Sequence, residues 1–197
     1  MKTTVFNKFA ETYNDRGIWE QWHNVEFSDY TEDFYREQVE KLCFDESDQN
    51  ILLYGKNGNG KTMLMNLAMK QLFQAGYEVY VIDFRHLMKE YIRSWKDDNT
   101  KIARFLTVDY LAIDDLGKEF KAEGVSAELA NATIDYILRY RVQRNKPTWL
   151  TFNMTLNEIK ATYNGHVASL LKRNTTAIEF TGADYGDKQF TKITKKK

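Results

Sequence analysis

The sequence has little cysteine, proline or histidine, and these shortages exclude several classes of protein. Cys43 is the one cysteine among 197 residues, so an internal disulfide is impossible, and three histidines leave a zinc cluster short of ligands. One proline and ten glycines exclude collagen-like and proline-rich low-complexity chains. No apolar run reaches the roughly 18–20 residues of a membrane span, and residues 1–15 lack the apolar stretch of a signal peptide. We therefore expect a cytoplasmic protein without a membrane partner.

The sequence also has no excess of charge of one sign. Lys and Arg together number 28, as do Asp and Glu, so the formal net charge is zero. This excludes a protein whose affinity for nucleic acid comes from bulk positive charge, and any such contact must come from a local patch. A length of 197 residues with 43% hydrophobic residues is typical of one soluble domain.

Short apolar segments alternate with amphipathic ones along the chain. The apolar segments predict strands at 51–54, 77–83, 110–114, 148–152 and 177–180. Helical spacing predicts helices at 32–44, 61–74, 84–95, 102–106, 127–144, from 155, and at 166–172. This alternation indicates an α/β domain of three layers, with parallel strands buried between helices and with ligands at the carboxyl ends of the strands. We expect an N-terminal arm at 1–30, a core at 31–182 and a basic tail at 183–197.

The first predicted strand runs directly into a glycine-rich segment, residues 55–62, of the form G-x-x-x-x-G-K-T. Its glycines allow the backbone to curl until successive N–H groups point at phosphate oxygens, and the helix that follows adds the positive end of its dipole. We expect Lys61 to reach the β- and γ-phosphates and the Thr62 hydroxyl to ligate Mg²⁺. A plain turn is the alternative, but the strand before it and the helix after it favour nucleotide binding. The predicted nucleotide-binding residues are Gly55, Asn57, Gly58, Asn59, Gly60, Lys61, Thr62 and Met63.

Polar residues end two later predicted strands. Asp114 and Asp115 follow the apolar run Tyr110 to Ile113, and Asn153 follows 148–152. Asp114 is expected to hold Mg²⁺ through its water shell, and Asp115 to orient or activate the water that attacks the γ-phosphate. Asn153 is expected to hydrogen-bond that water and the γ-phosphate, provided that its strand lies beside the phosphate-loop strand. Acidic residues and asparagines that merely begin turns are the alternative.

The runs ILLYGKNGNGKT, AIDDLGKE and KPTWLTFNMT resemble the AAA+ ATPase domain of bacterial and phage helicase loaders of the DnaC/DnaI type, and are also similar to the IstB transposition helpers. Asp-Asp-Leu-Gly at 114–117 is typical of that group, and the resemblance extends over residues 17–182. It implies a five-stranded P-loop NTPase (AAA+) core without a C-terminal lid, ATP with Mg²⁺, single-stranded DNA, and a hexameric replicative helicase as partner. It also implies Walker A roles for Lys61 and Thr62, Walker B roles for Asp114 and Asp115, and sensor 1 for Asn153.

The resemblance is incomplete in two respects. The arm is too short for the loaders' N-terminal helicase-binding domain. The family's arginine finger corresponds to Leu170, with Lys172 and Arg173 just beyond it, so we expect the chain alone to be a weak ATPase. Three functions stay open: a helicase loader acting in DNA replication, an IstB-like transposition helper, and a nucleotide-switched binding module with little catalysis. Assembly into a homo-oligomer also stays open.

Two clusters of basic residues have more than one interpretation. Arg139, Arg141 and Arg144 lie near a predicted helix end. They are either solvated cations that the helix dipole favours there, or residues that contact a partner or a phosphate. Residues 84–86, with 89–93, form either a packed phenylalanine with a solvated basic face, or a surface that stacks on and neutralises single-stranded DNA.

Three further side chains are assigned to packing. Trp19 and Trp22 are expected to pack within the arm rather than to form a binding platform. Cys43 lies on the apolar face of its helix and is expected in the core.

Overall fold

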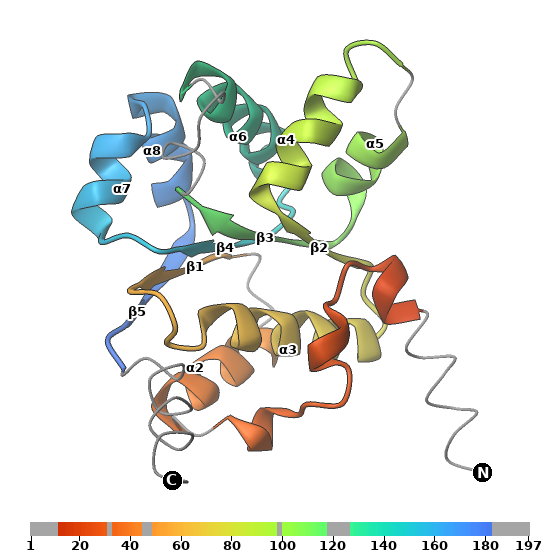
Figure 1. Ribbon diagram of the computed structural model, residues 1–197, viewed down its shortest axis with the longest axis vertical. Coiled ribbons are helices and arrows are strands. Elements are labelled where there is room, and N and C mark those ends of the chain that lie inside the picture. Colours follow the sequence, from red (N-terminus) through yellow and green to blue (C-terminus); the bar gives the residue numbers. More distant parts are fainter. Residues whose placement is uncertain (1–11, 31–32, 45–48, 98–99, 118–126, 183–197) are drawn as a thin grey trace, which may run out of the picture.

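The computed structural model describes residues 12–30, 33–44, 49–97, 100–117 and 127–182 (Figure 1). The strands are β1 (Asn50–Gly55), β2 (Val79–Asp83), β3 (Tyr110–Leu116), β4 (Thr148–Phe152) and β5 (Thr175–Phe180). The α-helices are α2 (Asp33–Phe44), α3 (Lys61–Gln74), α4 (Phe84–Arg93), α5 (Thr100–Thr107), α6 (Ala127–Val142), α7 (Leu156–Thr162) and α8 (Gly165–Lys172). Two short 3₁₀ helices, η1 (Glu20–Trp22) and η2 (Phe27–Asp29), belong to the N-terminal arm.

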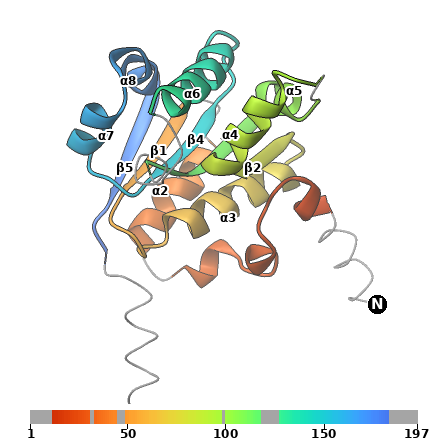
Figure 2. The same cartoon turned by 45° about the horizontal axis from the view of Figure 1, so that its top comes forward.

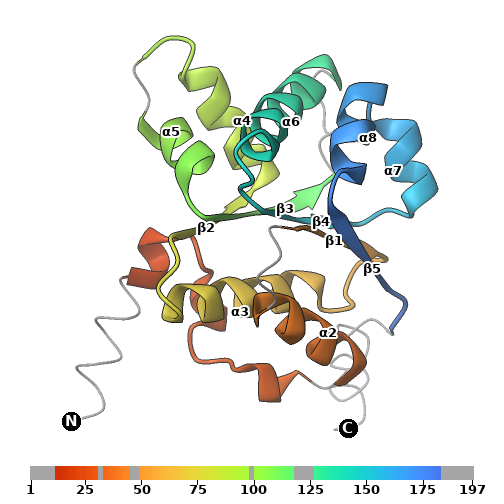
Figure 3. The ribbon, with the colours of Figure 1, turned by 180° about the vertical axis from the view of Figure 1, so that it is seen from behind.

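All strand pairs of the sheet are parallel, and the strand order is β2-β3-β4-β1-β5. Helices α2 and α3 and the arm cover one face, and α4 to α8 cover the other, as Figures 2 and 3 show from two further sides. The predicted three-layer α/β architecture is therefore confirmed. Because β4 lies between β1 and β3, the strand that ends before Asn153 is next to the phosphate-loop strand, as the sensor hypothesis required.

Alternation along the strands divides the core in two. Every residue of β1 is buried: Leu52 and Tyr54 pack in the cluster beneath α4 to α8, and Ile51 and Leu53 in the cluster beneath α2 and α3. Successive side chains of a strand point to opposite faces of the sheet. A strand that is covered on both faces must therefore be apolar throughout, which explains the short continuous apolar runs in the sequence.

The element boundaries agree with those expected from the sequence to within two residues. β2 begins at Val79 rather than at Tyr77, because Gly76 (φ +99°) ends the preceding helix and the Tyr77 N–H donates back to Leu72. β5 begins at Thr175, two residues earlier than expected. β3 runs on to Leu116, two residues beyond its expected end at Asp114, and so includes Asp115 as well. Both carboxylates therefore belong to the sheet rather than to a loop.

The arm packs against β2 and α3. The Val81 N–H donates 2.8 Å to the Arg16 carbonyl, and the Arg16 side chain pairs with Glu78. Farther along the arm, Glu26 forms a 2.9 Å ion pair with the buried Lys70 of α3. Within the described residues only Thr181 and Gly182 follow β5, so no lid is seen in that part of the chain. None of the described helices is both long enough and apolar enough to span a membrane.

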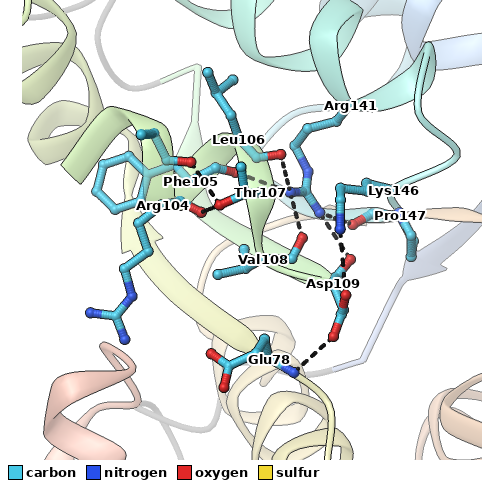
Figure 4. A network of polar contacts seen from close by, with 11 residues as sticks. Glu78, Arg104, Phe105, Leu106, Thr107, Val108, Asp109, Arg141, Lys146 and Pro147 are labelled. Atoms are coloured by element: carbon cyan, nitrogen blue, oxygen red, sulfur yellow. Dashed lines mark hydrogen bonds and ion pairs between the residues drawn. The ribbon is translucent and has the colours of Figure 1, made fainter. Parts of the chain in front are cut away.

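Arg141 is buried, which overturns the solvated-helix-end interpretation for this one member of the arginine cluster, whereas Arg139 and Arg144 are exposed as that interpretation expected. Arg141 is 0% exposed, and its guanidinium donates to the Thr148 hydroxyl at 3.0 Å. It also donates to backbone carbonyls, those of Phe105, Leu106, Val108, Asp109 and Pro147 (Figure 4). Burial lowers the pKa of Arg141 to about 9, so the group is still a cation at neutral pH. The hydrogen bonds of Arg141 thus connect α6 to the end of α5 and to the turn before β4.

The other two arginines of the cluster lie elsewhere. Arg139 is exposed and forms an ion pair with Asp135 at 2.7 Å, while the Arg144 guanidinium lies 3.6 Å from the centre of the Tyr140 ring. The three arginines therefore form no common surface. Helical spacing already placed Arg141 in line with Ala130, Ile134 and Ile137 on the buried face of α6, and this was the signal that it belonged to the interior.

Candidate nucleotide-binding site

The glycine-rich segment forms a tight loop between β1 and α3. Gly55, Gly58 and Gly60 have φ values of +131°, +78° and +87°, a region that other residues rarely adopt. Gly55 lies at the base of the loop, where a Cβ would come 2.3 Å from the Phe180 carbonyl oxygen of β5. A Cβ on Gly60 would come 2.7 Å from the Tyr30 ring. Neighbouring backbone and ring atoms therefore leave no room for a side chain at either position.

The Lys61 side chain is buried and turns back into the curve of the loop. Its ammonium donates to the Gly55 carbonyl at 3.1 Å, to the Lys56 carbonyl at 2.5 Å and to Asn59 Oδ1 at 2.9 Å. A cation and the N-terminus of a helix of 14 residues thus meet at the same loop. Both attract anions, since the first N–H groups of a helix lack partners within the helix.

The loop is held from outside by two contacts that the sequence did not indicate. Asn59 is buried and donates through Nδ2 to the Phe180 carbonyl at 2.7 Å. Tyr30, at the end of the arm, donates through its hydroxyl to the Asn59 carbonyl at 3.1 Å. No sequence pattern indicates that the last residue of the arm contacts the loop. The contact of Tyr30 with Asn59 depends on the path of the arm over α3.

The Thr62 hydroxyl and the Asp114 carboxylate lie together. Thr62 Oγ1 is 3.0 Å and 3.1 Å from the two carboxylate oxygens of Asp114, and the Thr151 hydroxyl of β4 also donates to Asp114. Asp114 is 0% exposed. Burial raises the pKa of its carboxyl, and the Asp115 and Asp83 charges act in the same direction, while the hydrogen bonds from Thr151 and Thr62 oppose the shift. A cation at this point would stabilise the ionised carboxylate.

Asp115 faces Asn153. The Asn153 side-chain amide donates to Asp115 Oδ1 at 2.6 Å, and both side chains are half-buried. Within the described ranges, no three or more His, Cys, Asp or Glu side chains are grouped so that they could hold a metal ion. Among those residues, the oxygen atoms of Thr62 and Asp114 are therefore the natural candidate for holding a hard divalent cation.

One open cavity of about 400 Å³ joins these groups. It is lined by Asn57, Gly58, Asn59, Gly60, Lys61, Thr62 and Met63 of the loop region, by Asp114, Asp115 and Asn153, and by Trp19, Gln21 and Trp22 of the arm. The residues predicted from three separate segments thus share one cavity, apart from Gly55, which is not among its lining residues. The two tryptophans were expected only to pack within the arm, but they also form a wall of this cavity.

A second open cavity, of about 680 Å³, lies beside the first and shares Trp19 with it. Its basic lining residues are Arg85, His86, Lys89 and Lys101. Phe84 is 0% exposed and packs in the core, so its ring is not available to stack on a base. The basic side chains that follow it are exposed at the cavity.

The position expected for an arginine finger belongs to the interior. Leu170 is buried in the core cluster that also contains the apolar face of α6. Lys172 and Arg173, the cations just beyond it, are exposed at the end of α8. Leu170 itself cannot contribute a charge to a neighbouring subunit.

Comparison with known proteins places this chain in a family. A family model described as IstB-like ATP binding protein matches residues 20–175. The replicative helicase loader DnaI of Bacillus subtilis (strain 168) is 25% identical over 114 residues, which are 57% of this chain and 35% of that protein. The chain thus spans about a third of the length of this curated relative.

Solved structures show the same fold. The DnaC helicase loader has a TM-score of 0.72 and 19% identity, and the match covers 83% of this chain and 100% of that chain. A replication initiator DnaA bound to AMPPCP and single-stranded DNA has a TM-score of 0.66 and 17% identity, over 90% of this chain and 56% of that one. The AAA+ type of P-loop NTPase fold implied by the sequence is therefore confirmed.

Proposed function

The chain belongs to the family of IstB-like ATP binding proteins, and from this premise we propose that the loop at 55–62 binds ATP with Mg²⁺ and that the site hydrolyses it to ADP and phosphate. The observation that carries the proposal is the shared cavity, in which Lys61, Thr62, Asp114, Asp115 and Asn153 meet. A cation, a helix N-terminus and two carboxylates around one space are the parts that phosphoryl transfer from a nucleotide requires.

The loop and its helix bind the phosphates. Backbone N–H groups of the loop and the Lys61 ammonium attract the β- and γ-phosphates, and the residues from Asn57 to Met63 line the space in which they lie. Thr62 and Asp114 would hold Mg²⁺, since their oxygen atoms already lie 3.0 Å apart and suit its preference for oxygen ligands. When bound, the ion supplies neutralisation of the phosphate charge.

Asp115 and Asn153 act on the attacking water. Asp115 orients the water or accepts its proton, because a carboxylate at hydrogen-bond reach of a nucleophile is a general base. Asn153 holds that carboxylate at 2.6 Å and offers an amide that can also reach the γ-phosphate. The chain alone turns over slowly, because Leu170 occupies the position expected for the arginine finger, whose loss costs about 10³-fold or more.

We further propose that the basic cavity next to the site binds single-stranded DNA. Arg85, Lys89 and Lys101 supply three positive charges against the two carboxylates of the lining, Asp83 and Glu90, and Trp19 supplies an aromatic ring in the wall shared with the nucleotide cavity. Such a combination suits a strand whose phosphates contact cations and whose bases stack. A replication initiator of the same fold has been solved with AMPPCP and single-stranded DNA together, which supports the proposal.

The proposed protein partner of this chain, in its ATP-bound state, is a hexameric replicative helicase. The similarity to DnaI, a replicative helicase loader, and the fold shared with the DnaC loader favour this partner. A role as a transposition helper is the second candidate, and the match to the IstB-like family model favours it. A nucleotide-switched module with little catalysis is the third, favoured by the buried Leu170.

The nucleotide site is tested with two lysines of the same loop. Lys61→Ala should abolish ATP binding in calorimetry and turnover in a phosphate-release assay. Lys56→Ala is the matched control, because the Lys56 side chain is exposed, and it should retain both activities. A Lys61→Ala protein that binds and hydrolyses ATP like the wild type would overturn the proposed site.

The partner is tested by co-purification with ATP and Mg²⁺ present. Retention by a hexameric replicative helicase supports a loader, and retention by a transposase instead supports the helper. Single-turnover hydrolysis with and without single-stranded DNA separates both from the module with little catalysis, which a fast, DNA-stimulated rate would exclude.

A further inference from the structure

The two aspartates of β3 lie opposite a single residue of β4. The ladder pairs on either side of them are Ile113 with Leu150 and Leu116 with Phe152. Asp114 and Asp115 therefore both face Thr151, and two residues against one is a β-bulge. Asp115 has a φ of +61°, in the left-handed region that residues other than glycine seldom adopt.

The bulge determines where the two carboxylates point. In a regular strand, consecutive side chains point to opposite faces of the sheet. Here Asp114 and Asp115 instead line the same cavity, the first beside Thr62 and the second beside Asn153. The irregular backbone thus makes two adjacent residues available to one site.

The Thr151 hydroxyl closes this bulge from the neighbouring strand. It accepts a 2.9 Å hydrogen bond from the backbone N–H of Asp115 and donates to Oδ1 of Asp114. A hydroxyl has one donor and two acceptor sites, so it can make both contacts at once. Thr151 is 1% exposed, so water does not readily replace either contact. A buried backbone N–H that leaves the ladder needs such a partner.

We propose that Thr151 is a positioning residue of this site: it holds the bulge that directs Asp114 to Thr62 and Asp115 to Asn153. The inference rests on the proposed ATPase function and deepens it. Thr151 acts only through the two aspartates, since the loop at 55–62 is held independently by the contacts of Asn59 with Tyr30 and Phe180. Removal of the hydroxyl should therefore weaken the binding of Mg²⁺ and slow hydrolysis. The loop should still bind the nucleotide phosphates as in the wild type.

The test compares Thr151→Val, which keeps the shape but lacks the hydroxyl, with Thr151→Ser, which keeps the hydroxyl. In the valine variant we expect kcat to fall by about 10²-fold, the scale of a misplacement near 1 Å. The Mg²⁺ concentration for half-maximal activity should rise, while ATP affinity measured in EDTA should stay within about twofold of the wild type, because Lys61 and the loop amides are unchanged. The serine variant should retain most of kcat and the wild-type Mg²⁺ midpoint.

Thr148→Val is the matched control. Thr148 is a buried threonine of the same strand, but its hydroxyl contacts Arg141 rather than the aspartates. It should lower the unfolding midpoint without moving the Mg²⁺ midpoint. A crystal structure of Thr151→Val gives a readout that does not depend on activity, and we expect Asp115 to turn away from Asn153.

The outcomes separate this role from the function on which it rests. A wild-type chain that neither binds nor hydrolyses ATP overturns the proposed function and this role with it. A hydrolysing wild type whose Thr151→Val variant keeps kcat, the Mg²⁺ midpoint and the Asp115 conformation overturns the role of Thr151 alone. Equal impairment of the serine and valine variants also overturns it, because the hydroxyl would then not be the cause.

Discussion

The side-chain amide of Asn153 donates a 2.6 Å hydrogen bond to Oδ1 of Asp115 and so joins the ends of β4 and β3. The two residues are 38 positions apart in the chain and meet because the two strands are neighbours in the sheet. In the proposed reaction the contact holds the carboxylate that faces the attacking water.

Asn153→Ala should slow ATP hydrolysis with little loss of ATP binding. Loss of one positioned donor costs about 10²–10³-fold in turnover at comparable sites. Binding is retained because the loop at 55–62 is untouched. Turnover and calorimetric affinity provide the measurement, and Asn157→Ala, an exposed asparagine on α7, is the control. A variant with wild-type turnover would show that Asn153 has no part in the reaction.

Arg141→Met should destabilise the protein strongly. Six acceptor groups receive hydrogen bonds from the Arg141 guanidinium, and a thioether satisfies none of them. Because each buried acceptor left without a partner costs about 1–3 kcal/mol, we expect the free energy of unfolding to fall by about 3 kcal/mol or more. Urea titration measures this change.

Arg139→Met provides the control for that substitution, because Arg139 is an exposed arginine two residues away on the same helix. Its unfolding midpoint should stay close to that of the wild type, since exposed ion pairs contribute little. Equal midpoints for the two variants would contradict the assigned role of Arg141.

The Cys43 thiol should be inert in the native protein. Burial raises the pKa of Cys43 from its ordinary 9.0 to about 12, so the reactive thiolate is scarce at pH 8. Native protein should therefore react with an aromatic disulfide reagent far more slowly than protein in urea. Between pH 9.0 and about 12 the native thiol keeps a proton that the unfolded thiol loses, so its contribution to stability falls as pH rises through that window. Rapid labelling of folded protein at pH 8 would contradict this prediction.

Nucleotide binding should change the intrinsic fluorescence of the arm. Trp19 and Trp22 line the nucleotide cavity, whereas Trp95 is 63% exposed on the segment after α4. Addition of ATP and Mg²⁺ should shift the emission of the wild type and of Trp95→Phe. The shift should largely disappear in a Trp19→Phe, Trp22→Phe double variant that still binds ATP by calorimetry. A full signal in the double variant would exclude contact between the arm and the nucleotide.

The strands, helices and phosphate loop were predictable because their signals are local. A covered parallel strand must be apolar at every position, and a helix with one buried face repeats its apolar residues at helical spacing. The glycines of the loop at 55–62 are required by the backbone conformation of that segment alone. For the same reason Gly76 was recognisable as the end of α3, although the exact start of β2 was not.

What the sequence by itself determined is the set of chemical groups: the lysine and threonine of the loop, two acidic residues and an asparagine at strand ends. Only the tertiary structure decided how they meet, because the order of parallel strands and the bulge opposite Thr151 arise from pairing between distant segments. It likewise decided that Trp19 and Trp22 line the cavity. Contacts of this kind depend on packing across the sheet and on the path of the arm, which no local pattern of residues encodes.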